Sequence, residues 1–263
     1  MQEVPTWEKS RSGAIDSSGV TYFASQVVSL LADRTVRTIT EPRESVISSL
    51  IVASMSGTEN AFAAVLAELK QTRTTLAALA DIYIPIVARR MGEAWEDDTL
   101  SWVDVSIGVG RLQGLLREIG AAWAADQAGD TGHGTVLLVI PEQEQHTLGP
   151  MVAMGQLRRY GISVCLRIAP SLDELRILMA TRSFDGVMIS VALQEKLPSV
   201  AKTIQFLKNV SPKPTPVIVG GAALSNLEDP ALCTDADLST NDISVALEAM
   251  GLKFDAFCVL KRA

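Results

Sequence analysis

The stretch that decides the fold is residues 135–149, with the sequence TVLLVIPEQEQHTLG. Its first six residues are apolar and β-branched almost throughout, a pattern typical of a strand buried in a parallel sheet. The polar residues that follow then leave the carboxyl end of that strand, the edge at which parallel sheets bind ligands. The stretch therefore predicts an α/β domain with a candidate site in residues 141–149.

Strand-like and helix-like segments alternate from this stretch to the end of the chain. Such alternation is typical of a doubly wound, Rossmann-like or flavodoxin-like parallel sheet covered by helices. We expect this cofactor domain to span residues 135–253, followed by a C-terminal tail at 254–263. The predicted strands are 135–140, 163–168, 186–191, 216–219 and one near Asp237, and the predicted helices are 150–160, 172–181, 200–207 and 242–250.

The part of the chain before the sheet has helical periodicity. We expect a helical bundle over residues 21–124, preceded by a flexible tail at 1–20 and followed by a glycine-rich linker at 125–134. Shorter apolar patterns predict helices near residues 46–51, 62–69 and 76–86, with a kink at Pro85. The clearest helix carries seven apolar residues at steps of three and four, which predicts a buried stripe. Its members are Trp102, Val105, Val109, Leu112, Leu116, Ile119 and Trp123.

Composition limits the function classes. Of 263 residues, 48% are hydrophobic and 20% are charged, which is enough to bury a substantial core. The net charge of −7 argues against electrostatic binding of the whole molecule to nucleic acid, leaving only a local basic cluster at Arg34, Arg37 and Arg43. Three cysteines, no signal-like apolar start and no segment near the roughly 20 apolar residues of a membrane span predict a cytoplasmic protein with no membrane partner.

Glu144, His146 and Gly149 follow the first strand in an E-x-H-x-x-G pattern. An imidazole can ligate a metal through one nitrogen while a carboxylate holds its other N–H, which fixes the tautomer. One histidine is too few for a zinc ion, which needs three or four protein ligands. It is enough where a macrocycle such as cobalamin or haem supplies the equatorial ligands. No phosphate-cradling glycine pattern follows the strand, so a nucleotide site is not favoured.

Two further patterns follow later strands: Ser190-x-x-Leu193, and then Gly220-Gly221. A helical bundle, a linker and an α/β domain carrying these three patterns in this order resemble the cobalamin-binding domain family. The resemblance implies that His146 replaces the cofactor's own dimethylbenzimidazole as the lower axial ligand of cobalt. It also implies that the displaced tail enters a slot beside the sheet, where the glycines leave room and Ser190 offers a hydroxyl.

The bundle adds a further likeness, because Gly92-x-x-Trp95 is similar to the family's G-x-x-W turn, whose tryptophan caps the upper face of the corrin. Adenosylcobalamin photoreceptors carry Glu-His ten and eleven residues after that tryptophan, where this chain has Val105 and Ser106. A hydroxo or aquo cobalamin is therefore expected rather than the adenosyl form. The cofactor-binding residues expected from the resemblance are Trp95, Glu144, His146, Thr147, Gly149, Ser190, Leu193, Gly220 and Gly221, with His146 on the metal.

Two positions depart from the family pattern. Glu144 stands where aspartate is usual, which makes the contact to the histidine one methylene longer. Ala192 stands where the family has the leucine of S-x-L, and Leu193 follows it directly.

Within the family, the segments EQHTLG at 144–149, QLRRYG at 156–161 and FDGVMIS at 184–190 are most similar to the AerR/PpaA group, stand-alone regulators of photosynthesis genes in purple bacteria. This resemblance implies a light-responsive antirepressor, not an enzyme, that binds a repressor of the PpsR/CrtJ type. Direct DNA contact is at most a secondary role. Two alternatives stay open: a corrinoid methyl-carrier protein of a methyltransferase system, and a haem-binding sensor of the same fold.

Each candidate residue also has an interpretation that involves no ligand. His146 is then a loop histidine, Glu144 a solvent-facing carboxylate and Ser190 a helix cap. Gly220-Gly221 is a plain turn, and Trp95 belongs to the core. His133, in the glycine-rich linker, is either an ordinary linker residue or one that reaches an open axial position.

Overall fold

The computed structural model describes residues 42–56, 58, 61–72, 74–126, 133–226 and 234–254. The chain divides into a unit of residues 1–35 and a unit of residues 36–263, and everything below concerns the second unit. The expected N-terminal tail, most of the linker and most of the C-terminal tail lie outside the described residues, as do Arg34 and Arg37.

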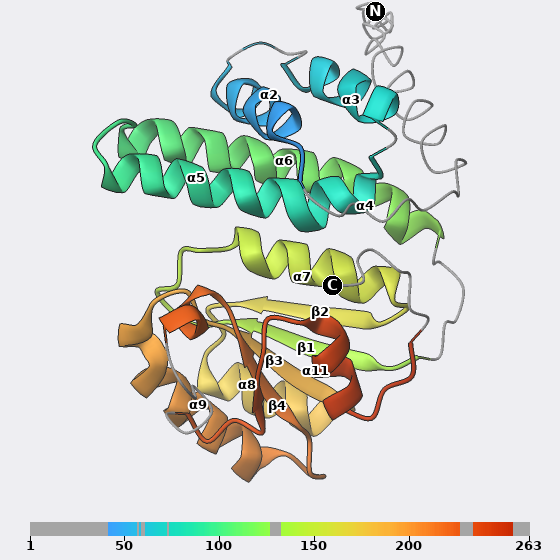
Figure 1. Cartoon of the computed structure of the whole chain (residues 1–263). Helices are drawn as coiled ribbons and strands as arrows, with labels where there is room; N and C mark the ends of the chain where they lie inside the picture. The colour runs from blue at the N-terminus through green and yellow to red at the C-terminus, as the bar shows by residue number, and fades with distance from the viewer. Residues whose placement is uncertain are drawn as a thin grey trace, which may run out of the picture. The chain divides into compact units, whose positions relative to one another are not determined.

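The sheet has five parallel strands in the order β2-β1-β3-β4-β5 (Figure 1). This is the flavodoxin-like order, which reverses direction between β1 and β3 and places a ligand crevice there. In β1 every residue from Val136 to Ile140 is at most 2% exposed, because the strand lies between two neighbours and under helices on both faces. The strands are β1 (Thr135–Ile140), β2 (Ser163–Ile168), β3 (Gly186–Ser190), β4 (Val217–Gly220) and β5 (Leu238–Ser239).

Helices cover both faces of the sheet, so the predicted doubly wound domain is confirmed. Alternate residues of β1 enter different cores: Leu137 packs with residues of α8 and α9, and Val136 packs with residues of α7 and α11. Each predicted strand and helix of this domain is present to within three residues at either end. The helices are α7 (Leu148–Arg159), α8 (Leu172–Thr181), α9 (Leu197–Val210) and α11 (Ile243–Ala249), with short 3-10 turns η2 (Gln194–Lys196) and η3 (Ala222–Asn226).

Most of the described residues before the sheet are helical, as predicted. The predicted helix at 76–86 is broken by a π-helical turn directly before Pro85, where the Ile84 N–H bonds to the Leu79 carbonyl. A proline lacks the N–H that a regular helix needs, so an irregular turn beside it has a clear cause. The elements are α2 (Glu44–Met55), α3 (Ala61–Thr72), α4 (Leu76–Ala78), η1 (Leu79–Tyr83), α5 (Ile84–Glu96) and α6 (Trp102–Asp126).

The apolar stripe predicted on α6 is buried only in the middle of the helix. Leu112, Leu116 and Ile119 are buried, but Trp102 at the first position is 66% exposed, so its assignment to the core was wrong. Periodicity detects a stripe but not the point at which the neighbouring helices stop covering it. The side chain of Trp123 lies outside the described part of the structure. In the described residues, none of the helices is long and apolar enough to span a membrane.

A candidate site at the carboxyl edge of the sheet

Glu144 lies in a tight loop between β1 and α7, and its side chain is only 1% exposed. Gln143 adopts a left-handed φ of 62°, and the Glu144 N–H donates to the Pro141 carbonyl at 3.2 Å, so the chain reverses and turns the carboxylate inward. The solvent-facing interpretation of Glu144 is therefore wrong. A buried carboxylate needs hydrogen-bond donors to remain charged.

Three donors hold this carboxylate. The His146 amide donates to Oε1 at 2.9 Å, and the His146 ring nitrogen Nδ1 lies 2.6 Å from the same oxygen. The Ala192 amide, just beyond β3, donates to Oε2 at 3.0 Å. Burial by itself raises the pKa of Glu144, but these bonds outweigh burial and leave the pKa below its ordinary value. The carboxylate thus joins the ends of β1 and β3, where the strand order reverses.

His146 is oriented by this contact. A carboxylate can only accept, so Nδ1 is the donor in this contact, and in the neutral imidazole Nε2 then carries the free lone pair. The side chain of His146 is 60% exposed, so Nε2 is accessible from outside the sheet. An imidazole held by a buried carboxylate is the arrangement found around metal-ligating histidines. Within the described residues no group of three or more His, Cys, Asp and Glu could hold a metal ion, so His146 would be a single protein ligand.

Thr147 connects this loop to the helical part of the chain. Gln113 of α6 donates from Nε2 to the Thr147 hydroxyl at 2.8 Å. Thr147 is also the N-cap position of α7, although its side chain makes no capping bond. Gly149 is exposed, and a Cβ placed on it would meet no atom within 4 Å. Gln113 could not be predicted, because nothing in the sequence of a helix marks which polar residue meets a loop 34 residues away.

Ser190 ends β3 and pairs with Gly220 of β4. The interpretation of Ser190 as a helix cap is wrong, because the next α-helix, α9, has Lys196 at its N-cap position. The Ser190 hydroxyl has no hydrogen-bond partner among the described residues. A hollow of about 360 Å³ lies just beyond these strand ends, between the loops that follow β3 and β4. Its lining is Ala192, Leu193, Gln194, Glu195, Ala222 and Ala223.

The two glycines have a structural role of their own. Gly221 has a φ of +120°, and a Cβ on it would lie 2.2 Å from the Val191 carbonyl oxygen. Asn241 holds this turn from the other side, accepting from the Gly221 amide at 2.6 Å. At Gly220, a Cβ would lie 3.0 Å from the Thr240 carbonyl oxygen. The turn therefore requires Gly221 whether or not a ligand approaches it, and the slot stays a prediction.

Trp95 and His133 occupy very different places. Trp95, near the end of α5, is 52% exposed, so it is not a core residue. His133 precedes β1, at the opposite edge of the sheet from His146, and its Nδ1 lies 3.2 Å from the Lys253 carbonyl. A six-residue strand is about 20 Å long, so His133 cannot reach an open axial position of a metal held by His146.

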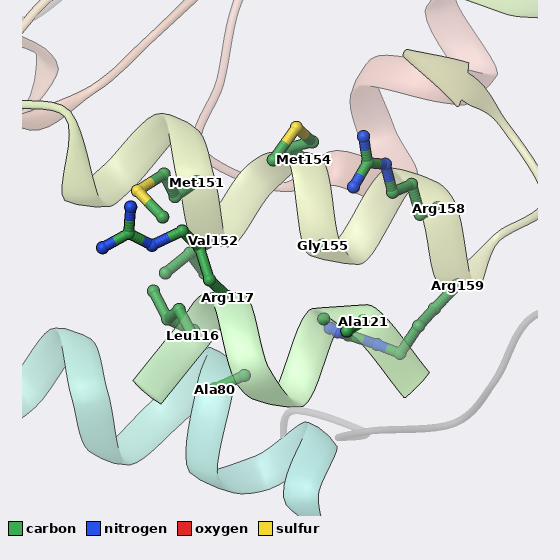
Figure 2. Close-up of a pocket in the computed structure, with 11 residues that line it drawn as sticks. Ala80, Leu116, Arg117, Ala121, Met151, Val152, Met154, Gly155, Arg158 and Arg159 are labelled. Atoms are coloured by element: carbon green, nitrogen blue, oxygen red, sulfur yellow. The ribbon is translucent and has the colours of Figure 1, made fainter. Parts of the chain in front are cut away.

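A cavity separates part of α6 from α7 (Figure 2). It has a volume of about 160 Å³ and is lined mainly by apolar groups such as Leu116, Met151 and Val152. Beside it, Arg159 of α7 forms a buried ion pair with Asp81 of η1 at 2.5 Å. The first and last turns of α7 are thus each tied to the helical part, by Thr147–Gln113 and Arg159–Asp81.

The sequence is similar to a Rhodobacter capsulatus protein described as an uncharacterised 20.5 kDa protein of the bchF–crtJ intergenic region. The two are 36% identical over 185 residues, which cover 70% of this chain and 96% of that protein. The chain belongs to the family of that protein. No protein-family model matches the sequence.

The chain also shares sequence with a longer protein. The chain is 31% identical over 181 residues to the HTH-type transcriptional repressor CarH of Myxococcus xanthus. The match covers 66% of this chain but only 57% of CarH.

A solved structure has the same fold. The Methanosarcina barkeri monomethylamine corrinoid protein superposes with a TM-score of 0.55 over 78% of this chain and 96% of that protein. Sequence identity is 14%, so the likeness concerns the arrangement of helices around a parallel sheet.

Proposed function

We propose that this protein binds cobalamin, with His146 as the lower axial ligand of cobalt, and that it regulates transcription by binding a repressor of the PpsR/CrtJ type. The observation that carries the proposal is the pair formed by buried Glu144 and exposed His146, which leaves Nε2 available to a metal. A corrin ring supplies the equatorial ligands that the described residues lack. Bound cobalamin supplies a cobalt centre whose upper ligand can be exchanged.

The surroundings of His146 fit a large cofactor with a tail. The hollow beyond β3 and β4 lies next to Leu193, and the Ser190 hydroxyl has no partner among the described residues. Gly149, beside His146, leaves open space where a side chain would stand. These groups would hold the displaced nucleotide tail, while Glu144 fixes the imidazole. Trp95, exposed at the end of α5, would cover the upper face of the ring.

The relatives support the regulatory half of the proposal. CarH is named as a transcriptional repressor, and the R. capsulatus relative is named for its position beside crtJ. The PpsR/CrtJ repressor is the partner implied by the sequence resemblance. This chain matches little more than half of CarH. In the proposal, the repressor that it binds carries the regulatory effect. Light or cofactor occupancy would change the ligands of cobalt and thereby the affinity for that partner.

Binding is tested by a visible spectrum of the purified protein after incubation with hydroxocobalamin and desalting. We expect wild type to retain a shifted corrin spectrum and His146→Ala to lose or alter it. His133→Ala is the matched control, because it removes the only other histidine, at the far edge of the sheet. If wild type keeps no cobalamin, or if both variants behave alike, His146 is not the ligand. The same samples incubated with haem test the alternative macrocycle.

Regulation is tested by capture of the purified repressor with and without cobalamin, in light and in darkness. We expect capture to depend on the cofactor and to be weakened in His146→Ala. Equal capture under all four conditions would contradict the proposed mechanism. Methyl transfer to the bound corrinoid by a partner methyltransferase would instead favour a carrier.

A further inference from the structure

Trp102 is an exposed aromatic residue that the proposed function leaves unused. It begins α6, its exposure is 66%, and it belongs to neither core cluster of the sheet domain. An indole ring carries a large apolar surface, so it usually packs against something or binds something. The question is which part of the molecule this side chain faces.

Helical spacing answers that question. Trp102, Ser106, Val109 and Gln113 follow one another at steps of four, three and four in α6. At 3.6 residues per turn these positions fall within about 60° of arc, so they share one side of the helix. Gln113 bonds to Thr147, the neighbour of His146, which shows that this side is turned toward the loop and the start of α7.

The same side continues in both directions from Gln113. Toward the C-terminus, Leu116 and Gly120 line the cavity against α7, and the two helices run in the same direction (Figure 1). Toward the N-terminus of α6, α7 no longer lies alongside, because α7 begins only after Thr147. Trp102 precedes Gln113 by 11 residues, which corresponds to about 16 Å along the axis of α6. The part of this side from Trp102 to Gln113 therefore extends beyond the start of α7. It is the same side of α6 that contacts the His146 loop through Gln113.

We propose that Trp102 lies over the upper face of the bound corrin and restricts the upper axial ligand to a small group. The inference rests on the proposed function, because it assumes that His146 holds cobalt from below. A second indole beside Trp95 would fill the space that a nucleoside-sized ligand needs. Water, hydroxide or a methyl group fits beneath it. Trp102 would then be a specificity-determining residue that excludes a 5′-deoxyadenosyl group by bulk, in addition to stacking on the ring.

The test compares wild type, Trp102→Ala and Val103→Ala in titrations with hydroxo-, methyl- and adenosylcobalamin in darkness. Val103 is the matched control because it is the next residue on α6 and is also exposed, at 45%, but projects about 100° away from Trp102. We expect wild type to bind adenosylcobalamin at least about tenfold more weakly than hydroxocobalamin. Trp102→Ala should remove most of that difference, and Val103→Ala should keep it, with all three proteins melting at the same temperature.

Two outcomes would overturn the role of Trp102 but leave the proposed function intact. In the first, wild type binds the adenosyl and hydroxo forms equally; in the second, Trp102→Ala keeps the wild-type ratio of dissociation constants. Loss of repressor capture in Trp102→Ala, with an unchanged ratio, would assign the residue to partner docking instead. A wild-type protein that binds none of the three cobalamins contradicts the proposed function itself, and the role of Trp102 falls with it.

Discussion

Replacement of Glu144 by glutamine removes one charge and one acceptor from a buried site with three donors. If the remaining oxygen occupies the place of Oε1, it still accepts from the His146 amide and ring, but without a charge to strengthen those bonds. The new amide group then faces the Ala192 N–H, 3.0 Å away in wild type, so two donors meet. Losing one bond to a charged group and weakening two others costs about 2–4 kcal/mol of unfolding free energy.

Urea denaturation of the cofactor-free protein measures this cost directly. In a unit of this size the loss corresponds to a melting temperature lower by about 5–15 °C. If His146 holds cobalt as proposed, cobalamin affinity should fall about 10- to 100-fold as well, because the residue that orients it is removed. Glu142→Gln is the control: Glu142 is exposed in the same loop, and its replacement should change stability by less than about 0.5 kcal/mol. If Glu144→Gln matches that control in both assays, the three hydrogen bonds to Glu144 contribute neither to stability nor to cobalamin affinity, and the reasoning is wrong.

Four further outcomes are expected from the described contacts. Asp81→Asn should lower the unfolding free energy by about 3–5 kcal/mol in denaturation experiments, because it leaves the buried guanidinium of Arg159 without its carboxylate. Gly120→Ala should raise it by about 0.5–1 kcal/mol, since a Cβ there meets no atom within 4 Å and alanine favours a helix, and a decrease would contradict the open geometry. Gly221→Ala should lower the unfolding free energy by more than about 2 kcal/mol, because the positive φ of Gly221 and the nearby Val191 carbonyl both exclude a Cβ. The folded-state pKa of Glu144 lies below its ordinary value of 4.5, so its contribution is present above pH 4.5 and is lost as pH falls through the folded-state value. Stability between pH 5 and pH 3 should therefore fall more steeply in wild type than in Glu144→Gln, and parallel curves would refute this.

The sheet was predictable from sequence because its central strands, β1, β3 and β4, are buried on both faces. A strand such as β1, covered on each side, must be apolar at every position, and this leaves a signal in a single stretch of sequence. The positions of Glu144, His146 and Ser190 at strand ends follow from the same alternation. Their proximity across β1 and β3 follows from the parallel topology, which brings carboxyl ends to one edge.

What the sequence could not predict are contacts made by groups without a local signature. The third donor to Glu144 is the backbone amide of Ala192, and every residue except proline has such an amide. Gln113 is one polar residue of a long helix until its contact with Thr147 identifies it. Trp102 continues an apolar stripe perfectly in sequence, yet the helices that would cover it do not extend that far.

The loop between β1 and α7 links the sheet to the helical part through adjacent residues. Glu144 fastens it to the end of β3, while Thr147 fastens it to α6. The other end of α7 is held by the buried pair of Arg159 and Asp81, which is costly to break. A displacement of His146 toward or away from a ligand therefore acts first on the single neutral bond between Thr147 and Gln113, worth only about 1 kcal/mol. The N-terminal half of α6, which runs from Trp102 to the bond at Gln113, is then the part of the bundle best placed to move if a bound group displaces His146.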